Sequence, residues 1–293
     1  MGMHCQGCAP EANYGDSLNA DLAMQLPKKQ LFFVHLPSCG GTTFWSILRH
    51  YYGQQNVLRF AGMPGDSEKY SDVRDSNPRY AGLSVIGGHT GIADAIERCP
   101  SRLLITFMRD PIERVLSVYH RRIRNGRWHP DPVLQERDIL RFCDPSNDVS
   151  NFSKYYAPVT SASASLDGIK QMMTRHLAVV GLTSDFNVSL FLLANKLGWE
   201  AVPTYDRRNI GGNKAELLPA DVLEEIAGLL AWDREIYRHG VALFESARRA
   251  LPSKVESDLL PAYERSLAER EAALKSTFAG GSPYVKTGPV SYT

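Results

Sequence analysis

The sequence has few cysteines, and their pattern does not suggest disulfides. The chain has 293 residues, with an odd number of cysteines at irregular spacing: Cys5, Cys8, Cys39, Cys99 and Cys143. A chain of this length can bury a core without disulfides, so we expect a reducing, cytoplasmic setting. Cys5 and Cys8 form a single CxxC beside His4, but a structural zinc site needs a second pair of ligands that the sequence lacks. We therefore expect no metal site.

Long apolar runs and a charge excess are also missing. No run reaches about 18 apolar residues, so we expect no transmembrane helix. Residues 1–22 carry acids and have no apolar central region, unlike a signal peptide. The net charge is +1 and the isoelectric point about 7.7, so nothing global indicates a nucleic acid or a membrane surface as partner. Any anion-binding function must come from local clusters of basic residues.

What is present indicates a globular α/β protein. Apolar runs at 31–36, 83–87, 102–108 and 177–182 predict buried strands, and helical periodicity follows at 42–52, 111–125 and 186–198. Alternating strands and helices predict a parallel sheet with helices on both faces. We expect a long loop over 53–80 and helices over 215–275. The domain organisation that follows is an irregular lead-in at 1–27, one domain at 28–252, and a C-terminal helix with a disordered tail at 253–293.

The first candidate site is a glycine loop at 37–43 between a buried strand and a helix. Glycines let backbone N–H groups approach an anion, and the helix N-terminus adds unpaired donors and a favourable dipole. Thr42 and Thr43 add hydroxyl groups in the first turn. The loop is not a Walker A motif, because no Lys-Ser/Thr follows its last glycine. By itself it is equally well explained as a tight turn.

The second candidate site begins at Arg109, directly after the strand at 102–108. Asp110 is suited to cap the next helix and Pro111 to open it, which places Ser117 two turns along. A guanidinium fork and a hydroxyl suit a phosphate, although a lone arginine here could equally pair with an acid. Both candidate sites follow strands of a parallel sheet, where ligands bind in such folds.

Together the two motifs resemble those of the carbohydrate sulfotransferases. The run F-x-H-x-P-x-x-G-G-T-T at 33–43 resembles their 5′-phosphosulfate loop, and R-D-P-x-x-R-x-x-S-x-Y at 109–119 resembles their 3′-phosphate segment; the pattern is closest to heparan sulfate 6-O-sulfotransferases. The resemblance spans roughly 31–245 and implies a P-loop-like three-layer fold. It also implies binding of 3′-phosphoadenosine 5′-phosphosulfate (PAPS) without a metal. The implied donor-binding residues are Pro37, Ser38, Cys39, Gly40, Gly41, Thr42, Thr43, Arg109 and Ser117.

The loop departs from the family at one place. Ser38 and Cys39 stand where the family has lysine and threonine. The family lysine stabilises charge on the bridging oxygen of the sulfuryl group. Without it, either another cation reaches the site or transfer is slow.

Other segments carry weaker resemblances. The segment around His89 is similar to the one that holds the catalytic histidine of the 6-O-sulfotransferases, which implies a general base; it could otherwise only hold its loop. His35 lies inside the strand run, so we expect a core histidine. Arg208, in the segment 207–212, is expected to close over the nucleotide. The basic stretch 120–129 is either a contact to donor or acceptor or a solvated face, and the block 179–199 looks structural.

The sequence thus predicts a PAPS-dependent sulfotransferase with His89 as base. A protein that binds PAPS or its product, 3′-phosphoadenosine 5′-phosphate (PAP), without turnover is one alternative. An ATP-dependent kinase fits less well, because the loop lacks a Walker lysine and no magnesium carboxylate is evident after it. The resemblance implies a glycan acceptor. The expected lack of an anchor favours a lipid-linked sugar or a small metabolite instead.

Overall fold

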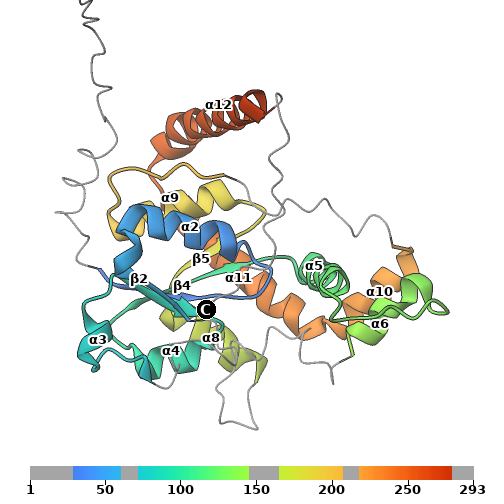
Figure 1. The fold of residues 1–293 in the computed structure, drawn as a ribbon. Helices are drawn as coiled ribbons and strands as arrows, with labels where there is room; N and C mark the ends of the chain where they lie inside the picture. Colours follow the sequence, from blue (N-terminus) through green and yellow to red (C-terminus); the bar gives the residue numbers. More distant parts are fainter. Residues whose placement is uncertain (1–28, 61–71, 145–164, 207–217, 279–293) are drawn as a thin grey trace, which may run out of the picture.

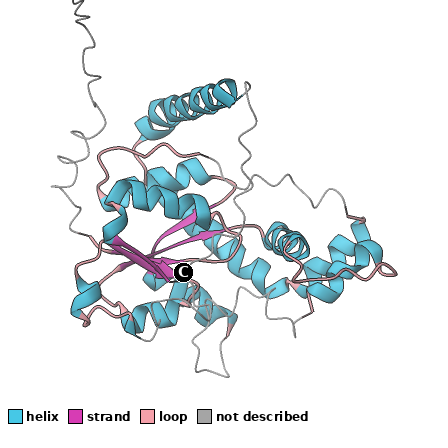
Figure 2. Ribbon diagram, in the orientation of Figure 1, coloured by secondary structure: helices cyan, strands magenta, loops and turns pink. Residues whose placement is uncertain are grey.

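The computed structural model describes residues 29–60, 72–144, 165–206 and 218–278. They form a three-layer α/β fold around one sheet (Figures 1 and 2). Its five strands pair in parallel in the order β2-β3-β1-β4-β5. The bounds are β1 Leu31–Val34, β2 Val57–Phe60, β3 Val85–Gly88, β4 Leu103–Met108 and β5 Leu177–Leu182. The predicted fold, a P-loop-like arrangement with a central parallel sheet, is confirmed.

Helices cover both faces of the sheet (Figure 1). One face carries α2 (Gly41–Tyr52) and α9 (Phe186–Leu197), and α12 (Leu260–Phe278) lies outside them. The other face carries α4 (Ile92–Arg98), α8 (Leu166–His176) and part of α11 (Ala231–Arg249). Strand β1 is enclosed between these layers, and all four of its residues are fully buried. That enclosure explains why its sequence is continuously apolar instead of alternating.

A second, smaller core lies beside the sheet, among α5 (Pro111–Arg124), α6 (Asp138–Phe142) and α10 (Ala220–Leu229). The fully buried carboxylate of Asp138 is hydrogen-bonded to two aromatic residues of this core. Asp138 accepts hydrogen bonds from the Tyr119 hydroxyl at 2.9 Å and from the Trp128 indole at 2.7 Å. Burial alone would raise the pKa of this carboxyl, but these donors lower it. The hydrogen-bonded carboxylate holds the C-terminal half of α5 in place.

The expected long loop at 53–80 is partly wrong. It contains a short 3-10 turn (Gln54–Asn56), the edge strand β2 and the one-turn helix α3 (Pro78–Ala81). Strand β2 has only four residues, and Phe60 alone is buried, so it leaves no periodic pattern to detect. Strand β1 is shorter than expected and ends at Val34, before His35.

The C-terminal region that the structure describes, from residue 218 to 278, is mainly helical. The predicted C-terminal helices are present, with a π-helical turn (Val255–Leu259) before α12. The Tyr263 hydroxyl of α12 donates to the Pro203 carbonyl at 2.7 Å, so this helix packs on the main body. No helix in the described ranges is both long and apolar enough to cross a membrane. The lead-in with Cys5 and Cys8, the tail from residue 280, and Arg208 lie outside the described residues.

Candidate active site

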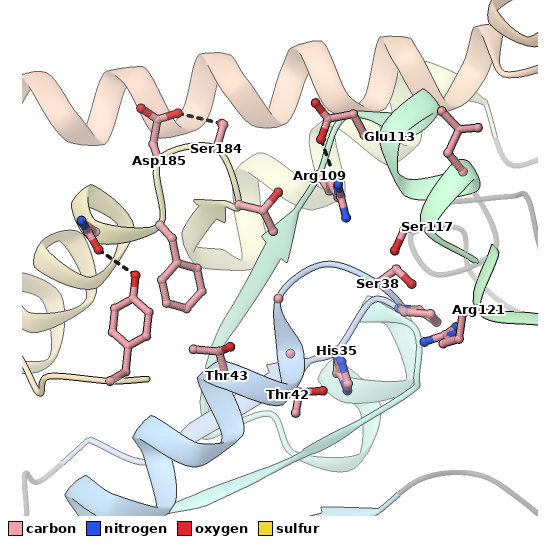
Figure 3. A pocket seen from close by; sticks show the side chains of 18 of the residues that line it. His35, Ser38, Thr42, Thr43, Arg109, Glu113, Ser117, Arg121, Ser184 and Asp185 are labelled. Carbon is pink, nitrogen blue, oxygen red and sulfur yellow. Dashed lines mark hydrogen bonds and ion pairs between the residues drawn. The ribbon is translucent and has the colours of Figure 1, made fainter. Parts of the chain in front are cut away.

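The two predicted motifs meet at the carboxyl ends of neighbouring strands. The loop after β1 is flanked by the ends of β3 and β4, because β1 pairs with both. They enclose a cavity of about 1070 Å³ (Figure 3). The predicted residues that line it are Pro37, Ser38, Gly40, Gly41, Thr42, Thr43, His89, Arg109 and Ser117. The structure therefore brings both motifs and the candidate base into one site.

The glycine loop presents backbone donors to this cavity. Gly40 is the N-cap of α2 and has a left-handed φ of 73°, and no side chain caps the helix. The first N–H groups of a helix have no partner inside it, so here they stay available to a ligand. Ser38 also has a positive φ, 63°, which is uncommon for a residue with a side chain. The loop thus holds a strained backbone shape that suits an anion.

Cys39 is the exception among the predicted loop residues, because its side chain does not line the cavity. It is fully buried, and its Sγ lies 3.7 Å from the Pro37 carbonyl. Burial raises the pKa of the thiol to about 11, although Arg114, Arg109 and a hydrogen bond from the Arg109 backbone oppose this. The thiol therefore stays protonated and joins the loop to the end of β4.

Arg109 follows β4 and reaches the cavity beside the start of α5. Asp110 caps this helix, since its Oδ1 accepts from the N–H groups of Ile112 at 2.9 Å and Glu113 at 3.1 Å, as predicted. The Nε of Arg109 lies 3.1 Å from Oε2 of Glu113. The alternative that Arg109 pairs with an acid is thus realised, but the pair is partly exposed and lies on the cavity wall. An exposed pair of this kind is weak enough for a phosphate to replace it.

Helix α5 turns a polar stripe toward the loop. Arg114, Ser117, Arg121 and Arg124 recur at intervals of three and four residues, which places them on one helix face. Arg114 is buried, and its Nε donates to the Pro37 carbonyl at 3.2 Å. That contact ties α5 to the loop, and the other three residues line the cavity. The basic stretch 120–129 was expected either to contact the donor or acceptor or to be a solvated face. Two of its arginines, Arg121 and Arg124, line the cavity.

Arg121 has an unusual electrostatic position. Its guanidinium has no hydrogen-bond or acidic partner among the described residues. Burial lowers its pKa, and so do the neighbouring arginines Arg122, Arg114, Arg124 and Arg127. The residue as a whole is exposed on the cavity wall, and a cation surrounded by like charges favours a bound anion.

His89 has the geometry of a base. Its Nδ1 lies 2.8 Å from the His35 carbonyl oxygen, which can only accept, so Nδ1 carries the proton and Nε2 the lone pair. Burial lowers the pKa of His89, the hydrogen bond to His35 opposes this, and Arg59 and Arg121 lower it further. The imidazole is therefore neutral near pH 7.

His35 differs in part from the expected core histidine. It is only 5% exposed, but it lines the cavity, because β1 ends one residue before it. Its ring stacks on that of His89, with centroids 4.2 Å apart. Burial is the main cause that lowers its pKa well below the usual value, followed by His89, Arg59 and Arg121.

Several cavity residues were missed by sequence analysis. The far wall, beyond β5, consists of Thr183, Ser184, Asp185, Phe186, Asn187, Val188, Tyr205 and Glu264. Part of the block interpreted as structural thus lines the site. Phe186 and Tyr205 form an edge-to-face aromatic pair with ring centroids 5.1 Å apart. Arg59, also missed, lies on β2 with its guanidinium 5.9 Å from the centre of the Trp45 ring. The described residues contain no cluster suited to a metal ion.

Comparisons with known proteins give only distant similarity. No protein-family model matches the sequence, and no curated protein matches it. A sulfotransferase structure from Alicyclobacillus acidocaldarius is 15% identical, with a TM-score of 0.45, covering 75% of this chain and 99% of that one. Mouse sulfotransferase SULT7A1 complexed with PAP is 12% identical, with a TM-score of 0.40, covering 85% and 94%. Similarity this low carries no functional argument.

Proposed function

We propose that the chain is a sulfotransferase that uses PAPS as donor and a hydroxyl or amine as acceptor. One observation carries the proposal: an uncapped glycine loop, an arginine–serine pair and a neutral histidine open on one cavity. A nucleotide with two separate anionic groups needs two anion sites on neighbouring strand ends. The loop supplies one, and Arg109 with Ser117 supplies the other.

The cavity residues fit such a donor. The loop N–H groups and the hydroxyls of Thr42 and Thr43 would hold the 5′-phosphosulfate. When the donor binds, the guanidinium of Arg109 would leave the carboxylate of Glu113 and bind the 3′-phosphate. The aromatic pair Phe186 and Tyr205, on the β5 side, offers apolar surface for the adenine base. The volume of about 1070 Å³ leaves room for an acceptor as well.

In the proposed reaction the acceptor oxygen or nitrogen attacks sulfur. A bond forms between the acceptor atom and sulfur, the bond from sulfur to the 5′-phosphate oxygen breaks, and PAP leaves with that electron pair. The acceptor proton moves to Nε2 of His89. The hydrogen bond from Nδ1 to the His35 carbonyl keeps that lone pair in place. Positioning and electrostatic stabilisation supply most of the acceleration.

Arg121 is the proposed replacement for the lysine that the loop lacks. It reaches the cavity from α5, and its charge acts on both His35 and His89. Arg59 acts on the same histidines from β2, but it also lies near the Trp45 ring. Arg121 has no such partner in the described part of the chain. This supports turnover over the alternative of a protein that binds PAP without reacting.

The proposed acceptor is a hydroxyl or an amine of a glycan or of a small metabolite. A glycan, as in heparan sulfate 6-O-sulfation, and a small metabolite both remain predictions, as do the cytoplasmic setting and the role of Arg208. Calorimetry with PAP and with ATP tests the donor. We expect PAP to bind more tightly than ATP, because ATP lacks a 3′-phosphate for Arg109. A preference for ATP would favour the kinase.

A screen with sulfur-labelled PAPS across glycans and small hydroxyl or amine compounds then tests transfer. We expect label on at least one acceptor and loss of that label in the His89→Ala variant. Tight PAP binding with no labelled acceptor would favour the non-catalytic binder.

A further inference from the structure

The cavity contains a buried histidine to which the proposed reaction gives no task. His35 lies at the end of β1, and only 5% of its surface is exposed. Its ring is held from both sides, by Phe33 at 5.2 Å and by His89 at 4.2 Å between ring centroids. Both contacts are stacked, at interplanar angles of 21° and 26°. These contacts fix the plane of the ring.

The tautomer of His35 is fixed by Trp45. The indole Nε1 of Trp45 lies 3.3 Å from Nδ1 of His35. An indole N–H can only donate, so Nδ1 must accept and cannot carry a proton. In a neutral imidazole the proton then sits on Nε2. Burial together with the charges of Arg59 and Arg121 keeps the ring neutral.

The protonated nitrogen faces the glycine loop. A methyl group added to Gly41 would lie 1.8 Å from Nε2 of His35, so this nitrogen sits directly against the start of α2 (Figure 3). Nε2 has no hydrogen-bond partner among the described residues, and it is not sealed from the cavity. Because this N–H opens on the cavity and no described protein group accepts from it, a ligand bound against the glycine loop can accept its hydrogen bond.

We propose that His35 is a further anion-binding residue, whose Nε2–H donates to the group held by the glycine loop while Trp45 fixes its tautomer. On the proposed function, to which this inference is tied, that group is the 5′-phosphate or phosphosulfate of the donor. His35 and His89 then form a pair of opposite roles. His35 donates a hydrogen bond from its Nε2, whereas His89 accepts a proton on its own Nε2.

The test is nuclear magnetic resonance of the ¹⁵N-labelled full-length protein, with PAP as probe. In the free protein we expect His35 to be protonated on Nε2 and not on Nδ1 at about pH 7. Saturating PAP should move the Nε2–H proton resonance downfield and slow its exchange with solvent by roughly tenfold or more. Protonation on Nδ1, or an unchanged resonance in a sample whose Gly40 and Gly41 amides shift with PAP, would overturn the assignment.

Two variants measure the contribution. Trp45→Phe keeps an aromatic ring but frees Nδ1, and we expect the Nε2-protonated form to lose dominance and PAP affinity to fall about threefold to tenfold. His35→Gln should weaken PAP by a similar factor, and the exposed His50→Gln on the same loop–helix unit should not. Circular dichroism verifies folding, and the resonance of the wild-type protein gives a result even if a variant fails to fold.

The same experiment separates the two levels of the proposal. If the wild-type protein shows no PAP binding by calorimetry, the proposed function fails and the role of His35 fails with it. If PAP binds normally but neither the resonance nor the variants respond, only the role of His35 is lost.

Discussion

The two walls of the cavity solve anion binding in different ways. The wall built from β1, β3 and the glycine loop is neutral and largely buried or half-buried, with backbone N–H groups and two hydrogen-bonded imidazoles. The wall built from α5 is charged and partly exposed, and its arginines Arg121 and Arg124 line the cavity. The glycine-loop wall depends on the exact positions of its groups, so we expect single substitutions there to cause large losses of activity or affinity. The α5 wall depends on the sum of its charges, so we expect each substitution there to cause a smaller loss.

The largest expected effect is on the loop wall, at His89. His89→Ala should lower the transfer rate by about 10²–10⁴ and leave PAP affinity within about twofold, because the base acts on the acceptor proton. The pKa of His89 is lowered, so the base is already free at neutral pH. The rate should therefore be flat above about pH 7 and fall only as the pH drops through that lowered pKa. Single-turnover rates across pH measure both.

A large loss of PAP affinity in His89→Ala, at unchanged folding, would contradict this assignment. It would mean that the imidazole holds the donor, as His35 is proposed to do. His129→Ala is the matched control, since His129 is exposed and does not line the cavity.

Gly41→Ala tests whether shape governs the loop wall. The new methyl group would lie 1.8 Å from Nε2 of His35, whose ring is packed on both faces and cannot turn away. Either the loop or the ring must shift. We expect PAP affinity to fall on the order of 30- to 100-fold, by calorimetry, at a cost typical of overpacking. Gly82→Ala is the control, since a methyl group there meets nothing within 4 Å.

Affinity within threefold of wild type in Gly41→Ala would show that the loop is pliable. The difference between the two walls would then be one of charge alone.

The strand ends and the helix cap that position this site were easier to predict from the sequence than the side chains that line it. Strand β1 and the Asp110 cap were predictable because a continuous apolar run and a capping residue are local features. Those features placed the loop and Arg109 at neighbouring strand ends. The approach of Arg59 and Arg121 to His89 depends on strand pairing and on the fit of α5 against the loop, so no local pattern reports it.

His35 shows the same limit at one residue. Its place in an apolar run predicted a core side chain, and it is indeed buried. Whether it also reaches the cavity depends on where the strand ends, and strand ends are poorly defined by sequence. Phe186 begins a helix inside the block 179–199, which was interpreted as structural, and Tyr205 lies in a loop outside any motif.

Arg109→Ala tests the α5 wall at the residue that we expect to contribute most to PAP affinity. Charged hydrogen bonds to phosphate contribute about 1.5–3 kcal/mol, so we expect PAP affinity to fall on the order of tenfold or more. The loss should vanish with adenosine 5′-monophosphate, which has no 3′-phosphate. Ser117→Ala should follow the same pattern with a smaller loss. Equal losses for both nucleotides would place Arg109 at the 5′ end and refute the two-site arrangement.

Arg121→Ala should act mainly on rate and on pH dependence. We expect transfer to fall about fivefold to tenfold, with PAP affinity less affected. Removing a positive neighbour raises the pKa of His89 toward its usual value, so the acid limb of the rate profile should move to higher pH. Arg127→Ala removes the same charge from the exposed end of this segment without lining the cavity, and should leave both unchanged. An unmoved acid limb in Arg121→Ala would separate Arg121 from the base.

The smallest effect is expected at Ser38, where a lysine would bring to the glycine loop the positive charge that Arg121 supplies from α5. Ser38 already holds a positive φ with a side chain present, so lysine can take the same backbone shape at little extra cost. With Arg121 supplying the charge, Ser38→Lys alone should preserve activity or raise it by no more than about threefold. In the Arg121→Ala background the same change should restore most of the lost rate, because a cation returns to the loop by another route. Single-turnover rates of the four proteins form a double-mutant cycle. Additive effects would show that position 38 and Arg121 serve different groups, and the charge lost from the loop would then have no replacement on α5.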